Sequence, residues 1–413
     1  MRQLVHWEGA AERLDDFEAT ASPAAWATLE RHVGVTLRGE LKDARMALAR
    51  EASAVRALFS AARNRTELER VADAVMRLRE RYLQTELLVD FFVDAVRSRS
   101  NPEVGIQLRA CDVMAERAIS TALAPLGRQT PPLITFFKPG IGASILRVGT
   151  PLWDGSISSV AAVKITWHNR LRPTALIHEC GHQFAGLTGW NEAFAQALRR
   201  GLGGREAMLG EQVALWASEI AADAFAFVHT GFAAVAALAD VVAGRGAQVF
   251  RFIEGDPHPI SFLRVMLGVA MCRRCYGLGP WDELAESWEA LHPLAAAPPL
   301  AGALVAALLP LLPRIVDLAL LTPLSCFAGK RLSDLVDPQR ASPGALRQLL
   351  RNAGDAAYTS SHYIWTECLR LTALAGMSFA TDPLSGRQRL CQQEQLMIRL
   401  GTMNWGGADR SVA

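Results

Sequence analysis

The sequence predicts a mainly helical protein of the α+β class, in which a small sheet lies between two helical regions. Long stretches place apolar residues three and four positions apart among Arg and Glu, which is the period of an amphipathic helix. A central stretch, residues 130–167, instead has short apolar runs separated by Pro and Gly, the pattern of strands and turns. Half of the 413 residues are hydrophobic and 20% are charged, so the chain can bury a sizeable core.

The first predicted region, residues 1–128, is a helical bundle. From Ala24 to Leu126 nearly every turn offers an apolar residue to one face, and Asn101-Pro102 marks a break within this stretch. One run with helical spacing consists of Leu68, Val71, Val75, Leu78 and Tyr82.

The second predicted region, residues 129–292, is a core that contains the sheet. Three of its segments are rich in β-branched and aromatic residues and are predicted strands: Leu133–Phe137, Ser144–Val148 and Ser159–Trp167. We expect the last of these to form a sheet edge next to the helix that follows it. Beyond that helix the chain is again helical, with predicted turns at 201–204, 244–246 and 255–259.

The third predicted region, residues 293–413, is helical and is expected to pack on the core. It opens with Leu294–Pro313, which has no charge and is about the ~20 residues that a membrane-spanning helix requires. Four prolines interrupt this segment, and Arg314 and Asp317 follow directly, so a buried helix is favoured over a membrane span. The spanning alternative stays open.

Charge and cysteine content narrow the partners and the compartment. The net charge is +2, and Arg residues alternate with Glu and Asp, which argues against a nucleic-acid partner. The seven cysteines are odd in number and scattered, so a reduced, cytoplasmic setting is expected, and Met1–Glu8 does not read as a secretory signal. Cys272 and Cys275 form a CxxC pair that we interpret as structural, with a zinc knuckle as the alternative.

A metal-binding motif lies on the helix predicted over residues 173–187. His178 and His182 are four positions apart, so their imidazoles share one face and can converge on one ion. Glu179, the next residue along, reaches the open side of that ion. The sequence therefore has the HExxH arrangement of a zinc site, with one zinc ion per chain expected.

The composition of this helix supports the functional interpretation. From Pro173 to Leu187 the only formally charged residue is Glu179, and a buried carboxylate is costly unless a cation or a metal-bound water pairs with it. The alternative is an apolar helix whose two histidines are satisfied by hydrogen bonds in the core. Cys180 projects from another face and is expected to be a packing residue, with a redox or regulatory role as its alternative.

A third ligand is expected because catalytic zinc usually takes three protein ligands and a water. Between Val213 and Val228, inside a helix predicted over residues 205–230, the only charges are Glu219 and Asp223, again four apart. We assign Glu219 as the third ligand and Asp223 as the acceptor that holds the other nitrogen of a ligating His. Glu192 as a ligand, Asp223 as a direct ligand and a purely structural pair remain alternatives.

HExxH followed by a Glu-x-x-x-Asp helix resembles the gluzincin metallopeptidases. The segment Asp256–Pro259, with Arg264 after it, resembles the His-Pro and downstream Arg pattern of the prenyl-protein peptidase and its bacterial heat-shock relatives. The resemblance covers about residues 160–270 and implies a zincin-like core in which His258 assists the oxyanion. The chain departs from that family in lacking a convincing set of membrane spans.

These residues predict a zinc metallopeptidase, a hydrolase that acts on a peptide or protein substrate. Glu179 would take a proton from a zinc-activated water and deliver it to the leaving amine. His258, Arg264 or Tyr276 would donate to the tetrahedral oxyanion. The substrate would lie extended along the Ser159–Trp167 edge by backbone pairing.

Two other functions remain open at this level. One is a helical scaffold or regulatory protein in which zinc is structural or vestigial. The other keeps the metal but changes the substrate to a small-molecule amide, or to a single protein cleaved in response to a signal. The oligomeric state is not predicted.

Overall fold

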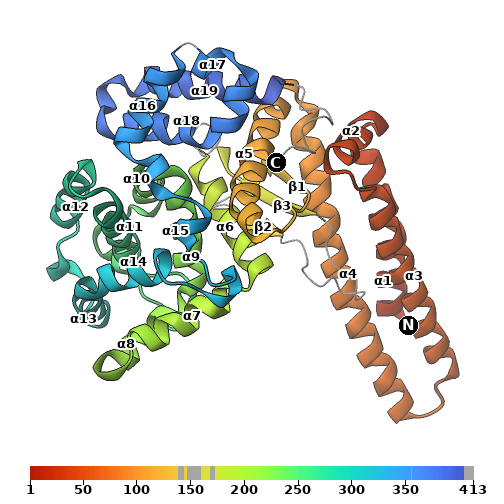
Figure 1. The fold of residues 1–413 in the computed structure, drawn as a ribbon. Coiled ribbons are helices and arrows are strands. Elements are labelled where there is room, and N and C mark those ends of the chain that lie inside the picture. Colours follow the sequence, from red (N-terminus) through yellow and green to blue (C-terminus); the bar gives the residue numbers. More distant parts are fainter. Residues whose placement is uncertain (138–143, 147–159, 168–172, 355, 404–413) are drawn as a thin grey trace. The chain divides into compact units, whose positions relative to one another are not determined.

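The computed structural model of the chain describes residues 1–137, 144–146, 160–167, 173–354 and 356–403. Within these residues the protein is mainly helical and carries a small sheet, as the sequence predicts (Figure 1).

Contacts divide the chain into two compact units that are interleaved along the sequence. Unit 1 comprises Met1–Leu108, Pro131–Lys138 and Leu146–Lys164, and unit 2 comprises Arg109–Thr130, Pro139–Ile145 and Ile165–Ala413. The sequence predicted three regions, each a single continuous segment: residues 1–128, 129–292 and 293–413. The helices on both sides of residue 292 belong to unit 2, and the division into three regions stays a prediction.

Unit 1 is built on a long helical hairpin. It contains α1 (Arg2–Arg13), α2 (Pro23–Val33), α3 (Leu37–Ala61) and α4 (Arg65–Ser100), and α3 and α4 lie side by side (Figure 1). Asn64 begins α4 by accepting a hydrogen bond from the backbone N–H of Glu67, which satisfies one of the free donors at the helix start. Asn101 separates α4 from α5 (Pro102–Leu123), as the Asn-Pro dipeptide predicted.

The sheet corrects one prediction about the site. Its strands are β1 (Leu133–Phe137), β2 (Ser144–Leu146) and β3 (Ala161–Ile165), and they are ordered β1-β3-β2. Because β3 is the middle strand, the Ser159–Trp167 segment is not the sheet edge that we expected to hold an extended substrate. Ser159 itself, and the predicted end of β2 at Arg147 and Val148, lie outside the described residues.

The helices of unit 2 that position the candidate site follow β3 in the chain. They are α6 (Thr174–Thr188), α7 (Trp190–Gly201), α8 (Ala207–Leu215), α9 (Ala217–Thr230), α10 (Phe232–Val242) and α11 (Ser261–Tyr276). Gly189 ends α6 with φ 74°, a left-handed conformation that glycine adopts without steric cost. The single helix predicted over residues 205–230 is two helices, α8 and α9, which meet at Trp216, where the backbone leaves the helical region at φ −90° and ψ 3°.

The remaining helices of unit 2 follow in the chain, and several of them pack against this group. They are α12 (Pro280–Leu291), α13 (Pro299–Leu308), α14 (Leu312–Leu320), α15 (Leu332–Leu335), α16 (Pro343–Ala353), α17 (Ala356–Thr359), α18 (Ser361–Thr381) and α19 (Gly386–Thr402). The long helix α18 packs against α10 and α19, and α14 packs against α11. Among the residues that the structure describes, one segment, Pro299–Phe327, is apolar and long enough to cross a membrane by length and composition. It comprises α13, a 3-10 turn at Leu309–Leu311, α14 and a second 3-10 turn at Ser325–Phe327, and 39% of its most apolar stretch is buried.

Candidate metal centre

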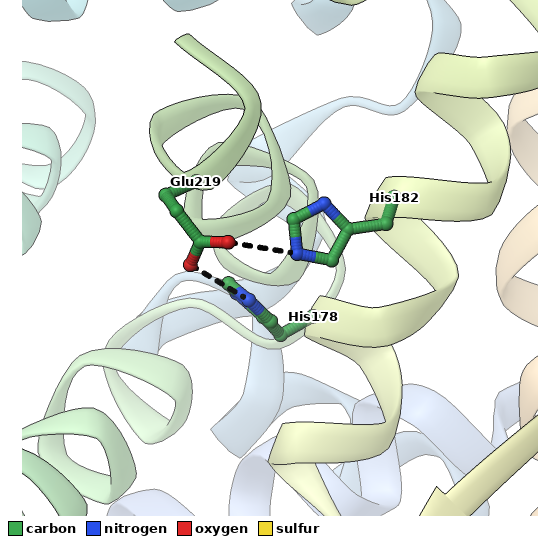
Figure 2. A group of neighbouring side chains, drawn as sticks. All are labelled: His178, His182 and Glu219. Carbon is green, nitrogen blue, oxygen red and sulfur yellow. Dashed lines mark ion pairs between the residues drawn. The ribbon is translucent and has the colours of Figure 1, made fainter. Parts of the chain in front are cut away.

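Three side chains from α6 and α9 converge on one point. His178 and His182 project from the same face of α6, and Glu219 projects toward them from the first turn of α9 (Figure 2). The Nε2 atom of His178 lies 3.4 Å from one carboxylate oxygen of Glu219, and the Nε2 atom of His182 lies 3.2 Å from the other. Ligand atoms on a tetrahedral zinc ion with bonds near 2.1 Å are about 3.4 Å apart. The three predicted ligands therefore form a cluster that can hold a metal ion, with all ligand atoms within 4.8 Å of one another.

The second nitrogen of each histidine is also engaged. Asp223 Oδ1 lies 2.8 Å from Nδ1 of His178, the relationship that the sequence predicted. Ser218 Oγ lies 3.2 Å from Nδ1 of His182. These contacts orient both rings so that Nε2 faces Glu219, as outer partners of metal-ligating histidines do. Ser218 was not predicted, although its place directly before Glu219 is a signal that could have identified it.

Arg264 on α11 neutralises part of the acidic charge in the centre. Its Nε and Nη2 atoms donate to the two oxygens of Asp223 at 2.9 and 2.8 Å, a bidentate pair, and Nη2 also lies 3.3 Å from Glu219. The side chain is only 10% exposed. The sequence expectation for Arg264 was a contact with the oxyanion or the substrate, whereas the structure places two of its nitrogens on carboxylates of the centre.

Burial and neighbouring charges shift the pKa values of the centre in opposite directions. Burial raises the pKa of Glu179, which is 8% exposed, so its carboxylate has an increased affinity for a proton. Burial would also raise the pKa of Glu219 and of Asp223, but hydrogen bonds from the histidines and the charge of Arg264 hold both pKa values below the usual range. Burial would lower the pKa of His178, but Asp223 and then Glu219 raise it to about 9.

His258 approaches the centre from the exposed loop before α11. Its Nε2 atom lies 3.8 Å from Glu219, and its Nδ1 atom lies 2.7 Å from Oδ1 of Asp256. The structure does not bring Tyr276 to the cluster, because its hydroxyl donates to the backbone carbonyl of Pro338 at 2.9 Å. Glu192, the alternative ligand, is exposed on α7 and is not part of the cluster.

The cysteines near the motifs do not contribute ligands. Cys180 is fully buried on α6, and burial raises the pKa of its thiol, which suits the expected packing role. Cys272 is buried and Cys275 is partly buried on α11, and both thiols are free. Neither cysteine belongs to the cluster of His178, His182 and Glu219.

A cavity of about 370 Å³ extends from the metal cluster between α9, α10 and α11. Its polar lining consists of the cluster together with Glu179, Asp223, His258 and Arg264. Its other walls are apolar and include Phe227, Val235, Leu238, Val241, Leu267 and Met271. A ligand that reaches the metal can therefore place an apolar group in the adjoining space.

Comparisons with protein-family models, curated proteins and solved structures found no match. The resemblance to gluzincin peptidases therefore stays an expectation that rests on the motifs of this chain. Within the described residues, the firm finding is a buried cluster of two imidazoles and one carboxylate that can hold a metal ion.

Proposed function

We propose that the protein is a zinc-dependent peptidase of the gluzincin type with a zincin-like core. His178, His182 and Glu219 would hold one zinc ion, since two imidazoles and one carboxylate are a common ligand set of catalytic zinc. The observation that carries the proposal is that a fourth polar side chain, the buried carboxylate of Glu179, lines the same cavity as this ligand set.

The residues around the cluster suit amide hydrolysis. When bound, zinc supplies Lewis acidity for the scissile carbonyl and lowers the pKa of the attacking water. Glu179 accepts a proton from that water and passes it to the leaving amine, a double role helped by its raised pKa. Asp223 and Ser218 keep the two imidazoles in orientation through their Nδ1 atoms.

The cavity supports a preference for peptides that carry a large apolar side chain next to the scissile bond. Its apolar walls begin beside the metal ligands, and the described residues that line it away from the centre carry no charge. Burying an apolar side chain there contributes roughly 1.5–3 kcal/mol. This preference replaces the strand pairing expected along the Ser159–Trp167 segment, because β3 is a central strand.

A cytoplasmic location is part of the same proposal. All seven cysteines of the chain lie in the described residues, and none of them forms a disulfide there, which suits a reducing compartment. The expected partner is a peptide or protein substrate, and the small net charge gives no reason to expect nucleic acid.

The test compares wild type with Glu179→Gln in metal analysis and in cleavage of a mixed peptide library. The variant should bind one zinc ion per chain and cleave nothing, because the base is lost while the three ligands remain. Glu192→Gln, an exposed acid on α7, is the matched control and should behave as wild type. Cleavage by Glu179→Gln would remove Glu179 from the role of base.

The alternative is a helical scaffold or regulatory protein in which the zinc is structural. One observation favours it: His258 lies close enough to Glu219 to be considered as a fourth protein ligand, and structural zinc sites are closed by four protein ligands. Wild-type protein that binds zinc but cleaves no peptide would move the interpretation toward this alternative.

A further inference from the structure

The Nε2 atom of His258 lies near one of the three predicted ligands, Glu219, although His258 is not part of the cluster whose ligand atoms all lie within 4.8 Å of one another. Its Nε2 atom is 3.8 Å from Glu219 Oε1, whereas the corresponding distance for His182 is 3.2 Å. Two ligand atoms on a tetrahedral zinc ion are about 3.4 Å apart, so His258 would have to move closer to the cluster to bind the ion.

The contacts of His258 with Asp256 engage its Nδ1 atom and leave its Nε2 atom free of that carboxylate. Both its backbone N–H and its Nδ1 atom contact Oδ1 of Asp256, at 2.9 and 2.7 Å. A carboxylate only accepts hydrogen bonds, so Nδ1 carries a proton and Nε2 is the nitrogen left to face a metal ion. Asp223 imposes the same arrangement on the ligand His178.

Nε2 of His258 and the carboxylate of Glu219 face each other at 3.8 Å, which is beyond hydrogen-bond distance. A metal ion coordinated by Glu219 could bind Nε2 as well if His258 moved closer to the cluster.

Exposure distinguishes His258 from the other three ligands. Its side chain is 60% exposed, whereas those of His178, His182 and Glu219 are 17%, 15% and 10% exposed. His258 also lies in a loop and not on α6 or α9, and Pro257 and Pro259 restrict the backbone on both sides of it. Rotation of this exposed side chain would therefore release the metal without disturbing the two helices that hold the ion.

We propose that His258 is a displaceable fourth ligand, which binds the metal ion in the resting protein and gives way when a substrate oxygen arrives. This inference rests on the metal centre of the proposed function but not on peptide hydrolysis. In the resting centre four protein side chains would bind the ion, and in the substrate-bound centre three side chains and a substrate oxygen would bind it. His258 would then act before the oxyanion forms, as a ligand that is replaced.

The test is X-ray absorption at the zinc edge on the full chain loaded with one zinc ion. We expect three imidazoles per zinc in wild type and two in His258→Ala. His362→Ala, which removes an exposed histidine on α18, is the matched control and should retain three. Addition of acetohydroxamate, a small bidentate zinc ligand, should reduce the wild-type count from three to two.

Other imidazole counts, or a failure to bind zinc, would each contradict a different part of the proposal. Two imidazoles in free wild type would reject His258 as a ligand and leave the proposed peptidase with water in the fourth position. Three imidazoles that persist with acetohydroxamate would reject displacement and favour a structural zinc. Failure of wild type to bind zinc would reject the metal centre itself.

A milder variant guards against misfolding of His258→Ala. Asp256→Asn keeps an oxygen that can accept from the His258 backbone but weakens the contact with Nδ1. Zinc affinity measured by competition with a chelator should fall about 10-fold, the lower end of the effect of losing an outer partner. An unchanged affinity in both variants would contradict the proposal.

Discussion

Gly181 on α6 lies directly against the backbone of Ala222 on α9. A Cβ atom at Gly181 would be 2.8 Å from the Cα atom of Ala222, a distance too short for two carbon atoms. Glycine at this position of the motif therefore allows the close packing of α6 and α9, and this packing brings His178 and His182 to Glu219.

Gly181→Ala should weaken metal binding because the added methyl group forces the two helices apart. Overpacking of this kind costs about 1–3 kcal/mol, so we expect lower thermal stability as well as at least a 10-fold loss of zinc affinity. Gly344→Ala on α16 is the control, since a Cβ there meets nothing within 4 Å. Chelator competition measures the zinc affinity of both variants, and thermal unfolding measures their stability. Equal zinc affinities of Gly181→Ala and wild type would show that α6 and α9 tolerate the methyl group.

Asp223→Asn should lower zinc affinity about 10- to 100-fold, because His178 loses its charged acceptor and Arg264 loses its bidentate partner. Ser218→Ala removes the neutral acceptor of His182, and a smaller loss is expected. The comparison uses chelator competition on both variants. A larger effect of Ser218→Ala would reverse the order of importance assigned to these two contacts.

The metal-free protein should lose stability as the pH rises from about 6.5 to about 9. The pKa of His178 is raised from 6.5 to about 9, so the stability it contributes is complete below pH 6.5 and is lost as the pH rises through the folded value. Denaturant unfolding with a chelator present, for wild type and His178→Gln, isolates this contribution as the difference in their pH slopes. Parallel slopes would show that His178 does not hold an extra proton in the metal-free protein.

Narrowing the cavity should change which peptides are cleaved. Ala234 lines the cavity on α10, so Ala234→Leu should reduce kcat/KM for peptides with a large apolar side chain next to the scissile bond, by 10-fold or more. Peptides with Ala at that position should be affected less. Ala303→Leu on the exposed side of α13 serves as the control. A uniform loss across all peptides would mean that the cavity does not set the preference.

The residues of the cluster could be predicted from the sequence because helical spacing determines which side chains share a face. His178 and His182, like Glu219 and Asp223, are four apart, and the acids are conspicuous in apolar segments. The motif helix was predicted over residues 173–187 and is observed as Thr174–Thr188.

Features that depend on tertiary packing could not be predicted in the same way. The break between α8 and α9 occurs at Trp216, which is neither Gly nor Pro and gives no local signal. The order of strands in a sheet is set by contacts distant in sequence, so the central position of β3 was missed. The partners of Arg264 and Tyr276 could not be predicted either, because residue spacing along one helix does not reveal which residues of other elements contact it.

The bidentate pairing of Arg264 with Asp223 has a consequence for ion selection. Glu179, Glu219 and Asp223 carry three negative charges when ionised, and Arg264 returns one positive charge, which leaves two negative charges among neutral imidazoles. A doubly charged ion makes this group electrically neutral, whereas a singly charged ion would leave an uncompensated carboxylate in a poorly solvated interior. The arginine thus helps to match the centre to a 2+ ion.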